Sequence, residues 1–161
     1  MSDRLAVMNA GRIEQLAAPS ALHERPRTRF VAQFLGACNV IEATVGEVRG
    51  DALRADTPVG PLQVRLQGDE TKLTPGAQRT LVIRPEKLHL LRERPEGVGN
   101  LLPASIAETI YGGAETTYRL HCGGLRLSAT AMNARTGFPG LRAGESVFCH
   151  LPAEALIVLE D

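Results

Sequence analysis

The chain has 161 residues, a length that suits one ordinary domain or two small ones. Eighteen basic residues balance eighteen acidic residues, and aromatic residues make up only 4% of the chain. This composition argues against a protein that neutralises phosphate backbones or stacks bases, so we expect no nucleic-acid partner. No stretch approaches the roughly 18 unbroken apolar residues of a membrane span, so no direct insertion into a membrane is expected.

The first 36 residues predict a hairpin followed by two short helices. In residues 4–17, two apolar arms flank Asn9-Ala10-Gly11, where Asn and Gly tolerate the positive φ of a tight turn. A helix is predicted from Pro19, with Ser20 as its cap, and a second helix in "RTRFVAQFLG" ends at Gly36. This segment is too small to bury its own apolar faces, so we expect residues 1–35 to be weakly anchored.

From Asn39 onward, the sequence predicts many short β-strands. Runs rich in Val, Ile, Leu and Thr alternate with Gly, Pro and Asp, a pattern typical of an all-β barrel or sandwich. The boundary between the two regions is placed near Gly36 to Cys38. The polar segment "RERPEGVGN", Arg92 to Asn100, is the clearest internal linker.

The β region contains two similar halves. Residues 73–91 align without a gap to residues 141–159, and Asn39 to Glu47 aligns with Asn100 to Glu108. The second half carries seven more residues between these blocks, which we place around "MNARTGFPG". Any two segments of strand and Gly turn resemble each other somewhat, and this remains the alternative. We predict two pseudo-repeated β units, about 39–91 and 100–159, which pack together because neither hides much apolar surface alone.

Motifs for catalysis or metal binding are scarce. The sequence has no G-x-x-x-x-G-K-[ST] phosphate loop, no G-x-S-x-G turn and no H-E-x-x-H. The dipeptides His121-Cys122 and Cys149-His150 contain zinc-ligand residues, but neighbours along a strand point to opposite faces and cannot share one ion. We therefore predict no catalytic, cofactor or metal site, and interpret Cys38, Cys122 and Cys149 as reduced thiols of a cytosolic protein.

The best candidate for a functional motif is Arg84-Pro85-Glu86-Lys87, between two predicted strands. It offers both charge signs in a setting stiffened by proline, which suits polar contacts at a seam between subunits or domains. The alternative is that the motif only forms a turn and faces water. Glu154 occupies the place of Glu86 in the second half, and for Glu154 we favour the turn.

The passage "SDRLAVMNAGRIEQLAAPSALHERPRTRFVAQFLG" closely resembles the end of the nucleotide-binding domain of ABC-importer ATPases. The following part resembles the transport-associated OB-fold (TOBE) domain of that family, and "VIRPEKLHLL" is similar to its characteristic R-P-E strand. "NVIEATV" and "AETIYGGAETTYRL" are most similar to the polyamine (spermidine/putrescine) branch. The family's phosphate loop, signature, acidic magnesium site and switch histidine lie upstream of this passage and are not among these residues.

The resemblance implies an OB-fold-like β domain over residues 37–161, preceded by a remnant of the nucleotide-binding domain over residues 1–36. It implies a non-catalytic module for regulation and homodimerisation of the ATP-binding subunit of an importer, with polyamines (spermidine/putrescine) as the transported solutes. The parent protein would use ATP and Mg²⁺, contact the permease subunits and lie peripherally on the cytoplasmic face of the inner membrane. The alternative is a sensor of substrate or oxyanion from an iron(III), sugar or phosphonate importer.

Overall fold

The computed structural model describes residues 3–68, 70, 72–133 and 140–161. It begins with the predicted hairpin, β1 (Leu5–Asn9) and β2 (Arg12–Ala17), followed by α1 (Pro19–Glu24) and α2 (Arg29–Phe34). Pro19 occupies the first turn of α1 as expected, but Ala18 is the N-cap and the prediction of a Ser20 cap is wrong. The Thr28 hydroxyl caps α2 by accepting a hydrogen bond from the Val31 amide at 3.3 Å.

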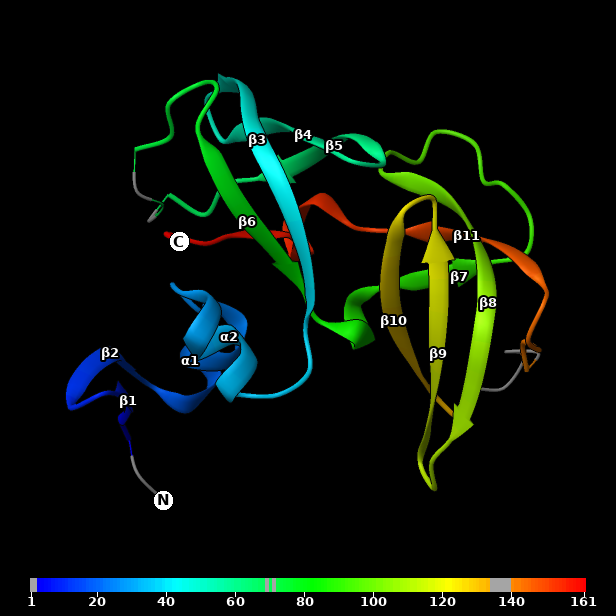
Figure 1. The fold of residues 1–161 in the computed structure, drawn as a ribbon, viewed down its shortest axis with the longest axis horizontal. Helices are drawn as coiled ribbons and strands as arrows, with labels where there is room; N and C mark the ends of the chain where they lie inside the picture. The colour runs from blue at the N-terminus through cyan, green and yellow to red at the C-terminus, as the bar shows by residue number, and fades with distance from the viewer. Residues whose placement is uncertain (1–2, 69, 71, 134–139) are drawn as a thin grey trace.

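The rest of the chain forms two five-stranded antiparallel sheets (Figure 1). The first half contributes β3 (Asn39–Arg49), β4 (Ala52–Thr57), β5 (Gly60–Arg65), β6 (Gln78–Ile83), the 3₁₀ turn η1 (Pro85–Lys87) and β7 (His89–Leu91). The second half contributes β8 (Leu101–Tyr111), β9 (Glu115–Cys122), β10 (Leu125–Met132), β11 (Ser146–His150), η2 (Ala153–Ala155) and β12 (Ile157–Val158). The predicted mainly-β fold built from two repeated units after a hairpin and helix pair is confirmed.

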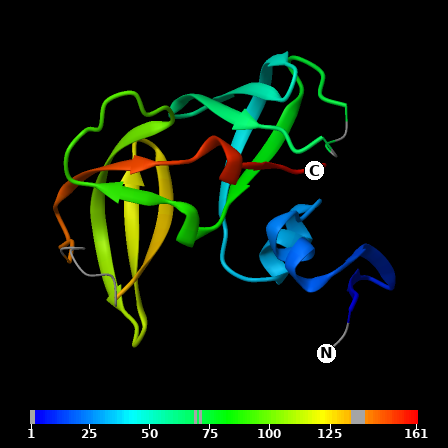
Figure 2. The ribbon, with the colours of Figure 1, turned by 180° about the vertical axis from the view of Figure 1, so that it is seen from behind.

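The two halves exchange their last strands. The sheet orders are β12-β6-β3-β4-β5 and β10-β9-β8-β11-β7, so each closing strand joins the sheet of the other half. Ile157 pairs with Val82 in the first sheet, and His89 pairs with His150 at the equivalent place in the second. Figure 2 shows the C-terminal strand leaving the second unit and crossing to the first. Neither half can therefore complete its sheet without the other.

Two asparagines tie the units together at equivalent positions. Asn39 donates to the carbonyls of Ile83 and Ser128 at 3.3 and 2.9 Å, and its side-chain oxygen accepts from the Ser128 amide at 2.7 Å. Asn39 is buried and Ser128 lies on β10 of the other half. Each bond therefore satisfies a polar group at the interface between the units.

Asn100 repeats this clamp in the opposite direction. It donates to the carbonyls of Leu151 and Gln63 at 3.0 and 2.6 Å, and accepts from the Gln63 amide at 2.7 Å. Its φ of 51° lies in the left-handed region, which Asn tolerates better than most residues. The two clamps form a pseudo-two-fold arrangement around one apolar core, to which Leu88 and Leu156 contribute from the two closing segments.

The clamps also show where the second half is longer. Ser128 lies 65 residues after Gln63, whereas Asn100 lies 61 residues after Asn39. Four of the seven extra residues therefore precede Ser128. They lie around the long β8–β9 hairpin, which projects from the molecule in Figure 1. The prediction that placed all seven around "MNARTGFPG" is therefore wrong for these four. Residues 134–139 of that segment lie outside the described residues.

The helix pair is anchored to the β region, in contrast to the weak attachment expected from the sequence. Ala32 of α2 packs with Val82 and Leu159 in a buried cluster. The segment also has a small core of its own, formed by Val7, Leu22 and Val31. The sequence pattern did not reveal that the C-terminal strand would lie against α2. The hairpin still exposes Met8 and Ile13, so its outer face remains uncovered.

Two polar contacts add to this attachment. Arg27 forms an ion pair with Glu160 at 2.7 Å, and the Arg29 amide donates to an Asp161 carboxylate oxygen at 2.7 Å.

Among the described residues, no helix is long and apolar enough to cross a membrane.

The asparagine clamps predict a specific order of stabilities. Asn39→Ala removes three hydrogen bonds at a buried position, so we expect a loss of about 2–3 kcal/mol in the free energy of unfolding. Asn100→Gly removes the equivalent clamp without backbone strain, and Asn100→Ala should cost about 1 kcal/mol more because its φ is positive. Urea denaturation measures all three, and a loss under about 0.5 kcal/mol for Asn39→Ala would contradict the clamp.

A matched pair of leucines tests the docking of the helix pair. Leu159 is fully buried beneath α2, whereas Leu91, at the equivalent position in the other half, is only half-buried. Leu159→Ala should cost about 2–4 kcal/mol and Leu91→Ala clearly less, because more apolar surface is lost at the covered site. Equal losses in thermal or urea unfolding would show that α2 does not cover Leu159 in solution.

Candidate functional site: the junction around Arg84

Arg84 fixes the N-terminal helices to the β region. It follows β6 directly, its side chain is 5% exposed, and its guanidinium donates to four backbone carbonyls. The acceptors are Ala32, Gly36 and Ala37 at 2.9, 3.1 and 3.1 Å, and His23 at 3.3 Å. These carbonyls lie at or after the C-terminal ends of α1 and α2, where helices leave unpaired acceptors with partial negative charge. A fork of N–H donors satisfies several of them at once.

The other three residues of the predicted motif surround this anchor. Pro85 is buried and begins η1, and the Lys87 amide donates to the Arg84 carbonyl at 2.9 Å. Glu86 is exposed, and its carboxylate oxygen Oε1 lies 3.5 Å from Nε2 of the His23 ring, a contact that contributes little to stability at such exposure. Arg84 and Pro85 thus have structural contacts at the junction, while Glu86 and Lys87 are available at its surface. Their regulatory role stays a prediction.

A cavity of about 430 Å³ opens beside the anchor. Its walls come from the N-terminal segment, from the 3₁₀ turns of both halves and from the loop after β5, and they include Glu24, Lys87, Glu154 and Gln67. Arg25 reaches over this space and donates to the Gln67 side chain at 3.4 Å. The cavity thus lies where all three parts of the chain meet, with carboxylates and cations on its walls.

The equivalent residues Glu86 and Glu154 do not meet at one seam. Glu154 lines the junction cavity, whereas Glu86 lines a second cavity of about 400 Å³ together with Tyr118 and Met132. The exchange of closing strands explains this separation, because it carries each 3₁₀ turn to the opposite unit. In the junction cavity, the N-terminal segment supplies a wall that the second cavity lacks.

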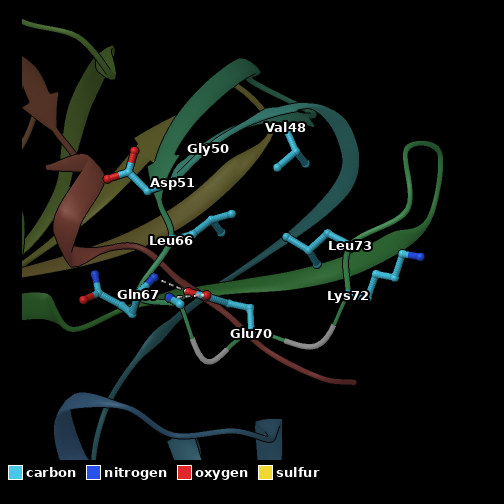
Figure 3. A pocket seen from close by; sticks show the side chains of 9 residues that line it. Val48, Gly50, Asp51, Leu66, Gln67, Glu70, Lys72 and Leu73 are labelled. Carbon is cyan, nitrogen blue, oxygen red and sulfur yellow. Dashed lines mark hydrogen bonds between the residues drawn. The ribbon is translucent and has the colours of Figure 1, made fainter.

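A wider cavity of about 640 Å³ lies on the first unit (Figure 3). Val48, Leu66 and Leu73 form its apolar side, and Asp51, Glu70 and Lys72 supply charges. The Glu70 carboxylate already accepts hydrogen bonds from the backbone amides of Gln67 and Gly68, at 2.5 and 2.8 Å. This cavity is separate from the motif that the sequence singled out.

The cysteines lie mainly inside the second unit. Cys122 and Cys149 are buried and their thiols hydrogen-bond to each other, which lowers the pKa of Cys122 and raises that of Cys149. Burial raises the pKa of Cys38. His121 is exposed while Cys122 is buried, so the two side chains lie on opposite faces. Within the described parts of the chain, no three metal-ligating side chains gather around one point.

Sequence reasoning missed the asparagine clamps, although a signal for them was present. Asn39 and Asn100 begin the two aligned blocks, and a shared polar residue at the start of equivalent buried strands indicates a buried hydrogen-bonding role. It also missed the partners of Arg84, because no pattern in the sequence links that residue to the ends of helices about fifty residues earlier.

Comparisons with known proteins agree with this architecture. A family model described as "TOBE domain" matches residues 81–159. The chain is 38% identical over 99% of its length to the "Spermidine/putrescine import ATP-binding protein PotA" of Frankia alni, and 37% identical over 99% to that of Rubrobacter xylanophilus. A protein of the same name from Pseudomonas aeruginosa is 38% identical over 85% of the chain. These matches span 36%, 41% and 38% of the relatives, so the chain covers well under half of their length.

A solved structure supports the fold independently. The molybdate-binding protein ModG superposes with a TM-score of 0.64, covering 74% of this chain and 94% of that protein at 17% sequence identity. At such low identity the likeness concerns the fold alone. The family-model match and the three relatives confirm the resemblance noted in the sequence. Residues 81–159 thus carry a TOBE domain, and the chain as a whole is similar to a part of ABC-importer ATP-binding subunits of the spermidine/putrescine type.

Proposed function

We propose that this chain is the regulatory and dimerisation module of the ATP-binding subunit of an ABC importer for polyamines. The names of the relatives support the polyamine class. In this proposal the parent subunit binds ATP and Mg²⁺ through residues outside these 161, contacts the permease subunits and lies on the cytoplasmic face of the inner membrane. The chain itself takes no part in the chemistry, since its sequence offers no phosphate loop.

The anchor at Arg84 is the observation that carries this proposal. The N-terminal helices are the part of the chain that resembles the end of a nucleotide-binding domain, and the buried guanidinium attaches their carbonyl ends to the first β unit. The exchanged strands then connect that unit to the second. A displacement of the helices is therefore transmitted to both units as a rigid-body movement, which a regulatory module requires.

Dimerisation is the second half of the proposal. The projecting β8–β9 hairpin and the adjacent end of β10 expose Ile110, Tyr111 and Met132, and Tyr111 is 74% exposed. An exposed aromatic with apolar neighbours is typical of an interface anchor. A standing contact between two β regions would raise the effective concentration of one ATPase domain for the other when ATP is absent.

The coupling role predicts how Arg84 variants behave in the complete importer. Arg84→Ala should lower polyamine-stimulated ATPase activity by about tenfold or more while leaving ATP binding by the subunit unchanged, because the attachment of the β units is lost. Arg126→Gln serves as the control and should keep full stimulation, since Arg126 is an exposed cation on β10 outside this motif. Full stimulation in a folded Arg84→Ala importer would refute the coupling.

The dimer prediction concerns the β region. Sedimentation of the 161-residue chain should show a dimer in the micromolar range, and Tyr111→Asp should dissociate it because a charge would be buried in an apolar contact. Ile13→Asp is the control, as Ile13 is 59% exposed on the N-terminal hairpin. A wild-type chain that stays monomeric at high micromolar concentration would exclude the proposed dimerisation. Dissociation by Ile13→Asp but not by Tyr111→Asp would show that the dimer interface lies at the N-terminal hairpin instead.

A further inference from the structure

The seam between β7 and β11 carries two histidines side by side. His89 and His150 are direct register partners on these antiparallel strands, so their side chains leave the sheet on the same face. Their ring centroids lie 5.7 Å apart with an interplanar angle of 88°. Cys149 and Leu90, one position along on each strand, point into the core, which places both imidazoles on the outer face.

The fold does not require this pair. At the equivalent place in the first sheet, Val82 and Ile157 form the same register pair with apolar side chains. The first seam is therefore closed by packing beneath α2, whereas in the second seam His89 is exposed and His150 is half-buried. Within the described residues, neither ring donates or accepts a hydrogen bond, so the ring nitrogens take no part in the hydrogen bonding that joins the two strands.

The geometry suits two ligands of one ion. Zinc–nitrogen bonds are about 2.0–2.1 Å long, which puts the centroids of two imidazoles on a tetrahedral ion about 5–6 Å apart. The observed separation of the two ring centroids falls in that range. A cross-strand pair is also held rigidly by its ladder, which reduces the entropy lost on binding.

We propose that His89 and His150 together bind one divalent transition-metal ion of the zinc, nickel or copper class, with water completing its coordination. Imidazole nitrogens favour these ions over magnesium and calcium, which prefer oxygen ligands. The ion would join the exchanged closing strand of the first half to the second unit. The site is independent of the proposed role in transport.

Charged groups of both signs lie near the histidine pair. Burial, and after it the neighbouring His89, hold the pKa of His150 below its ordinary value. The Glu154 carboxylate acts on His150 in the opposite sense and supplies negative charge nearby. His89 also borders the junction cavity, whose walls carry the carboxylates of Glu24 and Glu154 and the cations of Arg25, Arg84 and Lys87.

The test uses the 161-residue chain with any polyhistidine tag removed and metal stripped by a chelator. Calorimetric titration with Ni²⁺ and with Zn²⁺ should show one site per chain, and the ion should raise Tm by about 3 °C or more at saturating concentration. Mg²⁺ should do neither. His89→Asn should weaken binding about tenfold or more, since one of the two ligands is lost.

The pseudo-symmetry supplies a variant designed to keep the fold. His89→Ile with His150→Val recreates the pair found in the first sheet, so this double variant should fold normally and lose the response to metal. His121→Ala, which changes an exposed histidine on β9, should bind like the wild type. Absence of binding by the wild type, binding retained by the double variant, or loss of binding in His121→Ala would each overturn the proposal.

Discussion

A single buried guanidinium determines how the parts of this chain are joined. Arg84 is almost fully buried and donates to four carbonyls that the ends of α1 and α2 would otherwise leave without a partner. A buried charge is costly unless its donors are satisfied, and the helix ends satisfy it with dipoles rather than with a counter-ion. The helix pair and the first β unit therefore stabilise each other: the carbonyls at the helix ends accept from the buried guanidinium, and the guanidinium supplies the donors that these carbonyls lack.

The exchange of closing strands extends this dependence to the second unit. Each sheet of five strands is completed by a strand from the other half, and Asn39 and Asn100 clamp the halves in opposite directions. The same exchange separates Glu86 from Glu154 and places the histidine pair at a seam that packing alone closes in the other sheet. The repeated architecture thus has two equivalent surfaces, of which the helix pair covers one and leaves the other open.

Much of the fold could be predicted because local chemistry determines it. The turn at Asn9-Ala10-Gly11 is visible in the sequence, although its positive φ falls on Ala10 and Gly11 and not on Asn9 as expected. The proline at the start of α1 and the repeat that begins at Asn39 and Asn100 are visible as well. The junction was only partly predictable. The sequence singled out the Arg84 motif, but the acceptors of Arg84 and the cover over Leu159 are contacts between residues far apart in the chain, which periodicity does not encode. For that reason the N-terminal segment was expected to be weakly anchored.

Native-state hydrogen exchange tests the central claim most directly, because it measures the opening of each element separately. If Arg84 and the C-terminal strand join the parts into one body, the helical amides of Ala32 and Leu35 should exchange with the same free energy as the β6 amides of Leu81 and Val82. The two sets should also respond together as denaturant is added. Rapid exchange of the α2 amides through a separate opening, while β6 remains protected, would contradict this account.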